Sequence, residues 1–325
     1  MSTVPLMPKQ TAAIYGIEVS QGVAPDAAIG ALLTDFRTAG LPGVPTPFAE
    51  MGGAAASARE PHRLVAGLRE PTVAVSASFD IENFDYLLRP FFGAPTVTAG
   101  SGPDTGFSQR LFQAGNSVSP LTLRAGLGGE TRTATGLVGD SLEIPLGRTD
   151  GFRTITASYL AFELARQFAW SPSTTTAPRT RYEVPGFVAR LLINTVPFAF
   201  VDGTLTITGG ATRAPDVNNR DVLTPRPGMI GASIAATIEV TSDTQMDTFT
   251  RALTGSDDAV QVEFWPLASN RRRVLVDLPF VRISAPDFDV NAGATNVTAS
   301  VNITAGPDPA GSARSVAVQV WRVSP

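Results

Sequence analysis

The stretch from Thr72 to Gly93 constrains the fold more than any other part of the chain. Up to Glu82, apolar and polar residues alternate, and this period of two is typical of a half-buried β-strand. Asn83 is then a suitable helix N-cap, and Gly93 suits a left-handed helix end. Between them, apolar residues at helical spacing predict a packing face made of Phe84, Leu87, Leu88 and Phe91. The stretch therefore predicts a strand followed by one short amphipathic helix.

The same order of segments recurs in the second half of the chain. Ser233–Val240 alternates like a strand, and Asp243 can cap a helix that ends at Gly255. Further along, Val297–Ser300 repeats the pattern of Ile155–Ser158. The packing face of the second helix is predicted to be Met246, Phe249 and Leu253. We interpret the two halves as copies of one duplicated β domain; the alternative is a chance match of two generic β patterns.

The composition favours many short strands joined by turns. The 325 residues include 30 Gly and 26 Pro, and 43% of them are hydrophobic, which is enough for a packed interior. The predicted fold class is mainly β, with two tandem β-sandwich or barrel domains that each carry one short α-helix, plus long loops and arms. The polar stretch 171–181 has linker composition, so the predicted domains span 1–180 and 181–325.

Two kinds of segment predict breaks in the regular structure. The pairs Gly139-Asp140 and Asp202-Gly203 are typical of turns between strands. The segment 22–70 is rich in Ala, Gly and Pro, and it cannot be regular sheet throughout because Pro removes a donor from the ladder. This segment is either a long ordered loop or an arm that reaches a neighbouring subunit.

The charge pattern excludes several classes of partner. The net charge is −4, and Lys9 is the single lysine, so the chain lacks the basic stripe that grips nucleic acid by its phosphates. Cysteine is absent, which excludes disulfides and thiolate metal sites. We expect no membrane partner, because the sequence has neither a signal pattern nor a run of about 18 or more apolar residues.

No set of residues predicts an active site. His62 is the single histidine, so neither a catalytic triad nor a zinc cluster can form around it. The glycines at 126, 128 and 129 lack the spacing and the Gly-Lys-Ser/Thr of a phosphate loop. Asp257-Asp258 and the pair Asp287 and Asp289 can approach a calcium ion, but neither has the remaining ligands of a known loop. We therefore expect no enzyme, no cofactor and no metal.

Four segments occur in a familiar order: Tyr15–Glu18, Ser78–Gly93, Phe187–Asn219 and Gly255–Asp258. In this order the chain resembles the tail tube proteins of long, non-contractile-tailed phages, the major tail protein family. The resemblance covers most of the chain through loose patterns, with two departures. The usual single β domain of the family needs fewer residues, and the segment 22–70 has no counterpart.

The resemblance implies a virion protein whose sandwich or barrel strands continue into neighbouring subunits. Such subunits form stacked rings around a hollow tube, commonly with six tube domains per ring, through which the genome is ejected. If each chain holds two domains, three chains rather than six complete a ring. The implied partners are other copies of the chain, a tape measure protein, the tail terminator and distal tail proteins, and double-stranded DNA that passes without specific binding. The protein would be made in the bacterial cytoplasm and end in the phage tail.

A conduit for DNA needs few phosphate-neutralising cations in its bore. Polar positions on the alternating strands give the candidate acidic residues that face the lumen: Asp80, Glu82, Glu143, Glu163, Glu239 and Glu263. The basic cluster Arg271, Arg272 and Arg273 is either a solvated hairpin tip or an inter-subunit contact with an acidic rim. The segment Ala94–Ser119 and the N-terminal arm are predicted to connect one ring to the next.

A second class of function stays open at this stage. The chain also fits a soluble β-sandwich binding module, either glycan-binding or a baseplate accessory protein. Glycan sites usually expose aromatic residues, and the sequence offers Trp170, Trp265 and Trp321 with four tyrosines. Exposure of these aromatic rings therefore distinguishes the two functions.

Overall fold

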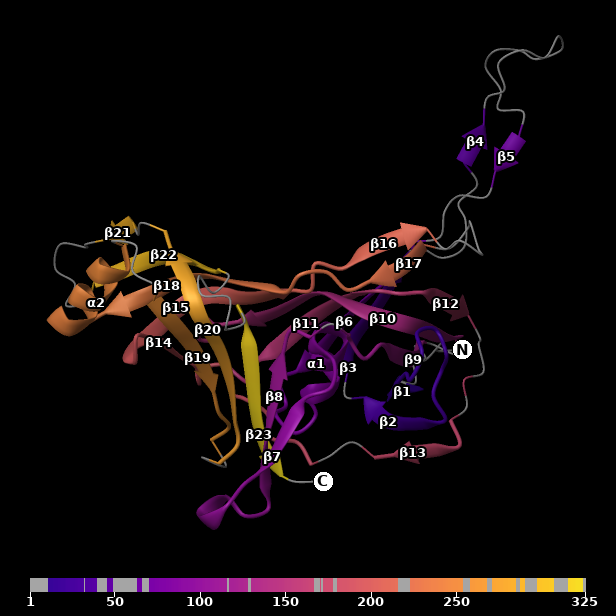
Figure 1. Ribbon diagram of the computed structural model, residues 1–325, viewed down its shortest axis with the longest axis horizontal. Coiled ribbons are helices and arrows are strands. Elements are labelled where there is room, and N and C mark those ends of the chain that lie inside the picture. The colour runs from indigo at the N-terminus through magenta and orange to yellow at the C-terminus, as the bar shows by residue number, and fades with distance from the viewer. Residues whose placement is uncertain are drawn as a thin grey trace, which may run out of the picture.

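The computed structural model shows a mainly β protein in which the described residues contain two short α-helices (Figure 1). The structure describes residues 11–31, 33–39, 46–48, 63–65, 70–115, 117–127, 130–166, 170, 172–177, 180–215, 223–253, 258–267, 271–284, 287–289, 297–306 and 315–323. Neither helix in these ranges is long and apolar enough to cross a membrane.

The first half of the chain supplies strands β1 to β13 and one α-helix, with a short 3₁₀ turn. In chain order these are β1 (Thr11–Ile17), β2 (Ala27–Ala31), β3 (Leu33–Ala39), β4 (Thr46–Phe48), β5 (Arg63–Val65), β6 (Thr72–Ser78), α1 (Asp85–Phe92), β7 (Thr96–Ala99), η1 (Gly102–Asp104), β8 (Phe107–Gln113), β9 (Leu121–Leu127), β10 (Glu130–Pro145), β11 (Thr154–Leu160), β12 (Glu163–Arg166) and β13 (Thr174–Thr176).

The second half supplies the remaining strands and the second helix. They are β14 (Arg190–Ile193), β15 (Val196–Thr208), β16 (Thr212–Pro215), β17 (Leu223–Arg226), β18 (Gly231–Val240), α2 (Asp243–Leu253), β19 (Asp258–Phe264), β20 (Arg273–Ile283), β21 (Asp287–Asp289), β22 (Val297–Ala305) and β23 (Ala317–Val323). The pairs β4–β5 and β16–β17 each form a separate two-stranded sheet.

The strands in each half of the described chain form a ring, which we call a barrel; backbone pairing alone closes the second ring, whereas in the first the chain itself joins β2 to β3. In the first barrel, β1 pairs with β2, the chain runs on into β3, and the order continues β3–β6–β11–β10–β9 back to β1. In the second barrel the order is β14–β15–β18–β22–β20–β19 and back to β14. The neighbours within both barrels are antiparallel. In the first barrel α1 follows β6, and in the second barrel α2 follows β18.

The register shows how closely the two barrels correspond. Ala157 of β11 lies opposite Val75 of β6, the strand that leads to α1. Ala299 of β22 lies opposite Ile238 of β18, the strand that leads to α2. The repeated Thr-Ala-Ser triplets of the sequence therefore occupy the same place in the two barrels.

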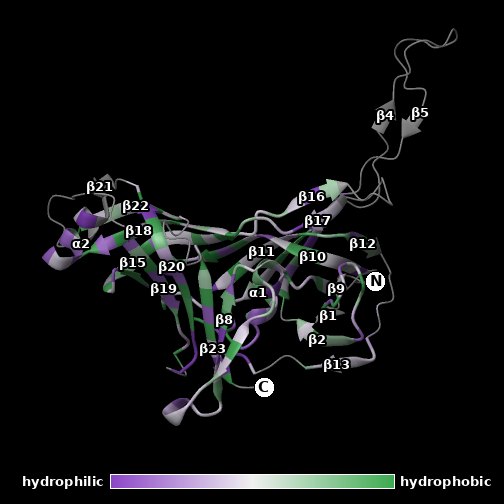
Figure 2. Ribbon diagram, in the orientation of Figure 1, coloured by the Kyte–Doolittle hydropathy of each residue, from purple (hydrophilic) through white to green (hydrophobic). Residues whose placement is uncertain are grey.

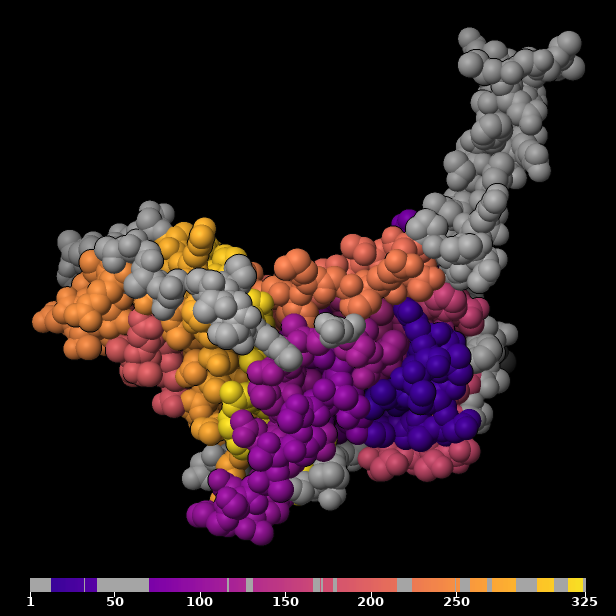
Figure 3. Space-filling model, viewed as in Figure 1, coloured from indigo at the N-terminus to yellow at the C-terminus, as the bar shows by residue number. Residues whose placement is uncertain are grey.

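The two barrels share one sheet. Ser141–Pro145 of β10 pair with Thr204–Thr208 of β15, so a sheet runs without a break through β3–β6–β11–β10–β15–β18–β22–β20. A second link joins β8 to β23, which lie side by side although the chain separates them widely (Figure 3). One hydrophobic cluster fills both halves, and apolar residues gather where β8, β20 and β23 meet (Figure 2). The predicted boundary at residue 180 therefore does not divide the sheet or the core.

Helix α1 forms as the sequence predicts, with one difference at its start. It begins at Asp85, and Phe84 rather than Asn83 is the N-cap residue. Gly93 ends it with a φ of 82°, and its N–H donates to the carbonyl of Arg89. The predicted packing face is confirmed, because all four of its side chains are buried: Phe84, Leu87, Leu88 and Phe91.

The packing face of α2 is confirmed in part. Met246 is half-buried and packs against the hydrophobic core. The side chains of Phe249 and Leu253 lie outside the described residues.

Both predicted glycine–aspartate turns are wrong, since they lie inside long strands. Gly139-Asp140 falls within β10, where the register with β11 shifts between Gly139 and Ser141. Asp202-Gly203 falls within β15, where the register with β18 shifts after Phe200. A bulge uses the same residue types as a turn, and it bends a strand without ending it. These bulges let β10 and β15 belong both to a barrel and to the shared sheet.

We expect Gly139→Ala to destabilise the fold by about 1–3 kcal/mol, since it overpacks a tight contact. A Cβ at this position would lie 2.5 Å from the ring of Phe91 on α1. Gly115→Ala is the matched control, because its nearest neighbour would be 3.8 Å away, and it should change stability by less than about 0.5 kcal/mol. Urea unfolding midpoints measure both. Equal midpoints for the two variants would show that α1 does not pack on β10 in this way.

Candidate functional site

The shared sheet has one apolar face and one polar face, because side chains alternate along each strand. Toward the core, Phe36, Val75, Ala157, Leu142 and Ile207 are buried partners on adjacent strands. One position away, a row of backbone partners crosses all eight strands with side chains that are half-buried or exposed: Asp35, Ser76, Thr156, Glu143, Thr206, Ser233, Thr304 and Arg282.

Neighbouring rows extend this polar surface over both barrels. We call the row and its same-side neighbours the hydroxyl face; the neighbours are Arg37, Ser141, Thr154, Ser158, Thr208, Ala235, Thr237, Glu239, Ser300 and Asn302. Most of these residues are serine or threonine. The Ser76 and Thr156 hydroxyls lie 3.5 Å apart across β6 and β11. None of the residues named for the hydroxyl face is aromatic.

The side chains of the hydroxyl face are of a kind that can touch a nucleic acid without holding it. Proteins hold duplex DNA chiefly by neutralising phosphates with Arg and Lys, and single strands by stacking bases on aromatic rings. The row that crosses the sheet contains one cation, Arg282, and two carboxylates, those of Asp35 and Glu143. Arg37 also lies beside this row, but its Nε is paired with Asp35 at 2.6 Å. Little positive charge is therefore left to hold a phosphate backbone.

The six predicted lumen carboxylates fall into three groups. Glu143 and Glu239 lie on the hydroxyl face and stay candidates. Glu163 is exposed on β12, where it lines a small cavity away from that face. The prediction is wrong for Asp80, Glu82 and Glu263, which are only 4%, 3% and 8% exposed and so cannot face a lumen.

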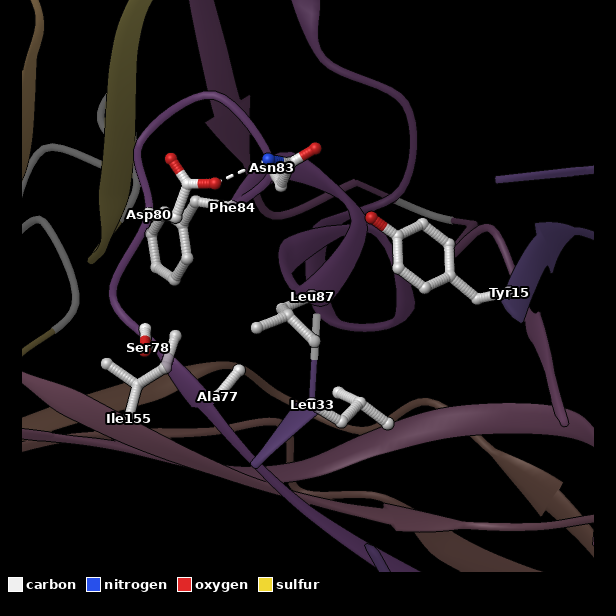
Figure 4. A pocket seen from close by; sticks show the side chains of 9 residues that line it. All are labelled: Tyr15, Leu33, Ala77, Ser78, Asp80, Asn83, Phe84, Leu87 and Ile155. Atoms are coloured by element: carbon white, nitrogen blue, oxygen red, sulfur yellow. Dashed lines mark hydrogen bonds between the residues drawn. The ribbon is translucent and has the colours of Figure 1, made fainter. Parts of the chain in front are cut away.

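Asp80 organises the turn between β6 and α1. Its Oδ1 accepts from the backbone N–H of Tyr182 at 2.8 Å and of Glu82 at 3.2 Å, and its Oδ2 accepts from the Asn83 amide (Figure 4). Burial raises the pKa of this carboxyl, against the lowering effect of these donors. Beside Asp80 lies a small pocket that Tyr15 lines from β1 (Figure 4). The carboxylate thus has a structural role.

A buried ionic cluster fixes α1 to the strands around it. The Oδ2 atom of Asp85 accepts from Arg110 of β8 at 2.7 Å and from Arg322 of β23 at 2.6 Å. Arg322 also donates to the carbonyl oxygen of Glu82 at 2.9 Å. The Glu82 carboxylate pairs with Nε of Arg272 at 2.7 Å. We call these five residues the α1 ion cluster; they connect elements from both ends of the chain.

The Arg271–Arg273 cluster makes its contacts within the chain. The guanidinium of Arg272 lies 3.5 Å from the ring centroid of Tyr182 and also pairs with Glu82. Arg273 lies over Trp321, 4.1 Å from the ring centroid, and 3.5 Å from the Glu263 carboxylate. Arg271 is exposed near Phe107. A contact between subunits stays a prediction for all three arginines.

Two structural residues carried no recognisable signal in the sequence. Arg153 is 1% exposed and donates to the carbonyls of Pro145 and, at 2.6 Å, Gly186, so it links the two halves. Burial lowers the pKa of its guanidinium to about 10. Glu18 is buried and accepts from the N–H groups of Gly22 and Gly136, both at 2.7 Å. Arg153 belongs to no motif, and the Tyr15–Glu18 pattern gives no sign of this role for Glu18. For each residue one partner, Gly186 or Gly136, comes from a distant segment.

No group of three metal-ligating side chains gathers anywhere in the described ranges. Comparison with models of known protein families finds no match for the chain, and comparison with characterised proteins finds none either. The hydroxyl face is therefore the feature on which a function can be argued.

We expect Asp85→Asn to destabilise the protein by about 3–5 kcal/mol, because it leaves Arg110 and Arg322 buried without a counter-charge. Asp35→Asn is the matched control. It breaks the pair with Arg37, whose side chain is 81% exposed, and should cost less than about 1 kcal/mol. Denaturant midpoints at neutral pH measure both effects. A loss no larger than that of the control would remove the α1 ion cluster as a structural anchor.

Proposed function

We propose that this chain is a structural protein that assembles with copies of itself into a hollow tube, the tail tube of a long-tailed phage. In this proposal the hydroxyl face lines the bore through which double-stranded DNA passes. The single observation that carries it is the continuity of that face across both barrels, backed on its other side by the shared core. A large polar face suits a wall better than a binding site, since ligand sites are usually concave and mostly apolar.

The physics of DNA transport supports this orientation. DNA must slide past the wall, so the wall must neither release many counter-ions on contact nor stack bases. Serine and threonine hydroxyls exchange hydrogen bonds with water at little cost, and threonine favours strands. Glu143 and Glu239 add negative charge, which repels phosphate. The opposite face is unsuitable, because its side chains form the core.

The correspondence of the two barrels supports a tandem duplication. Both have the same strand order, the same pairings and a helix at the same place. Three chains would then supply six barrels to each ring of the tube. The further partners in this proposal are a tape measure protein, the tail terminator and the distal tail proteins. The place of action is the virion.

The β7–β8 hairpin is the part of Ala94–Ser119 that suits a contact between rings. Its end extends from the body of the molecule, and Thr96–Ala99 are all exposed (Figure 1). The rest of the segment has a different role, since β8 pairs with β23 and Phe112 is fully buried. Deleting all of 94–119 would therefore unfold the subunit instead of only preventing stacking.

The alternative function, a glycan-binding or accessory module, has less support. Trp170 is buried, with its indole N–H donated to the carbonyl of Pro25. Trp265 and Trp321 lie under the guanidinium groups of Arg190 and Arg273. No tryptophan of the chain is thus left as an open platform for a sugar ring.

Electron microscopy of the purified protein tests the proposal. Concentrated protein in negative stain should form hollow tubes or rings, and symmetry analysis of the images should give threefold density that is pseudo-sixfold. A protein that stays monomeric, with carbohydrate binding on a glycan array, would instead support the accessory module. Six equal densities per ring would show six chains in place of three.

We expect Thr206→Arg to make assembled tubes retain DNA, because it places one added cation per chain in the bore. Thr244→Arg is the matched control, since Thr244 is exposed on α2, away from the hydroxyl face. Co-sedimentation of tubes assembled with linear duplex DNA should show retention for Thr206→Arg alone. The logarithm of the DNA-binding constant should fall linearly with the logarithm of the salt concentration, with a slope of about −0.9 per phosphate contact. Equal retention by both variants would contradict a lumenal hydroxyl face.

A further inference from the structure

We propose that Asp150 is a site of spontaneous backbone rearrangement to isoaspartate, and that this change loosens a contact between the two halves of the chain. Asp150 is followed by Gly151, and an Asp-Gly pair favours this reaction because glycine leaves the attacking nitrogen unhindered. The inference goes beyond the proposed function and does not depend on it. It rests on a comparison of the two Asp-Gly pairs in the sequence, at 150–151 and 202–203.

The reaction needs no reagent other than water. The backbone nitrogen of Gly151 attacks Cγ of Asp150, an N–Cγ bond forms, and the carboxyl group loses one oxygen as water, which leaves a cyclic imide. Water then opens the ring. Attack at Cγ restores aspartate, whereas attack at the main-chain carbonyl carbon leaves the chain joined through Cγ. The second product has an extra methylene in its backbone and carries a carboxylate on the neighbouring carbon.

The structure leaves the first Asp-Gly pair free to react. Asp150 and Gly151 lie in the loop between β10 and β11, and both are exposed. The N–H of Gly151 has no acceptor among the described residues. Gly151 has a φ of 84°, and a Cβ built on it would have no neighbour within 4 Å. The nitrogen and the carboxyl group can therefore rotate toward each other without breaking a contact.

The second Asp-Gly pair is restrained. Asp202 and Gly203 belong to β15 and pair with the neighbouring strand β18. The N–H of Gly203 points at Oδ1 of Asp202, 2.7 Å away, whereas attack needs the nitrogen over Cγ. A Cβ on Gly203 would lie 2.5 Å from the Cβ of Ala236, so the backbone there is closely packed. The strand must open before this pair can react, and opening costs free energy.

The loop of Asp150 also holds the beginning of the second half of the chain. Gly186 donates its N–H to the carbonyl of Gly151 at 2.8 Å, and Arg153 donates its N–H to the carbonyl of Val184 at 2.9 Å. The Arg153 guanidinium donates to the Gly186 carbonyl at 2.6 Å. We call these three hydrogen bonds the clasp. Because Val184 and Gly186 precede β14, the clasp joins the first barrel to the second.

Isoaspartate at position 150 lengthens the backbone directly before the clasp. The extra methylene displaces Gly151 relative to the residue before it, while β10 and β11 stay fixed by their own pairing. The hydrogen bond from Gly186 to Gly151 is therefore the first that the rearrangement breaks. The clasp is weakened as a result, and the midpoint of urea unfolding should fall as the protein ages.

Mass spectrometry of aged protein tests the site. The purified protein would be kept at neutral pH in water enriched with heavy oxygen and then cleaved with trypsin. Trypsin cleaves after arginine, so the two Asp-Gly pairs fall in separate peptides, 149–153 and 191–213. The peptide 149–153 should gain one labelled oxygen and a second chromatographic peak. Its rate should exceed that of 191–213 by at least about tenfold, which corresponds to about 1.4 kcal/mol of strand opening.

Two variants and one solvent condition serve as controls. Asp150→Glu keeps the charge but needs a larger ring, which closes far more slowly, so it should gain no label in 149–153 and its midpoint should not fall with age. Asp202→Glu should leave the rate at Asp150 unchanged. In guanidinium chloride, where no strand restrains either pair, both peptides of the unchanged sequence should gain the label at similar rates.

The outcomes distinguish the two parts of the inference. Equal rates at the two pairs in the folded protein would overturn the proposed site. So would the absence of rearrangement at Asp150 after a time in which the denatured chain has reacted at both pairs. Rearrangement without any fall in the unfolding midpoint would overturn the link to the clasp. All of these results can be read on unassembled protein, so a failure to form tubes affects none of them.

Discussion

The pairing of β10 with β15 is the interaction on which the rest of the architecture depends. Five backbone partner pairs, from Ser141–Thr208 to Pro145–Thr204, turn two barrels into one sheet with one core. The same strands must also close their own barrels, and the bulges after Gly139 and Phe200 allow both. Arg153 stabilises the end of this junction by donating to carbonyls on either side of it.

The α1 ion cluster makes a second, different link between the halves. Removing charges from water is costly, and a hydrophobic replacement of similar shape is often as stable. Such a cluster is better explained by the specificity of strand pairing, since the Asp85 carboxylate accepts from Arg110 of β8 and from Arg322 of β23 at once. If β23 paired with another strand, its buried Arg322 would lose the Asp85 carboxylate and the Glu82 carbonyl as acceptors. We infer that the cluster selects β8 as the neighbour of β23.

The sequence predicted the features that depend on local periodicity. The strand and helix between Thr72 and Gly93, and the apolar face of α1, follow from spacing alone. The two predicted turns failed because glycine and aspartate serve bulges as well as turns. Asp80 and Glu82 failed because β6 ends at Ser78, and beyond a strand's end alternation no longer predicts a face.

Glu263 failed for another reason. It lies within β19, but Arg190 on β14 and Arg273 on β20 flank its carboxylate and cover it. The hydroxyl face has no pattern of charge that marks it in the sequence, because the proposed conduit needs the absence of groups that hold DNA. Such a surface works through an average property of many side chains, and serine and threonine can replace each other there. A function of this kind leaves no motif; it becomes visible once strand pairing shows which residues share a face.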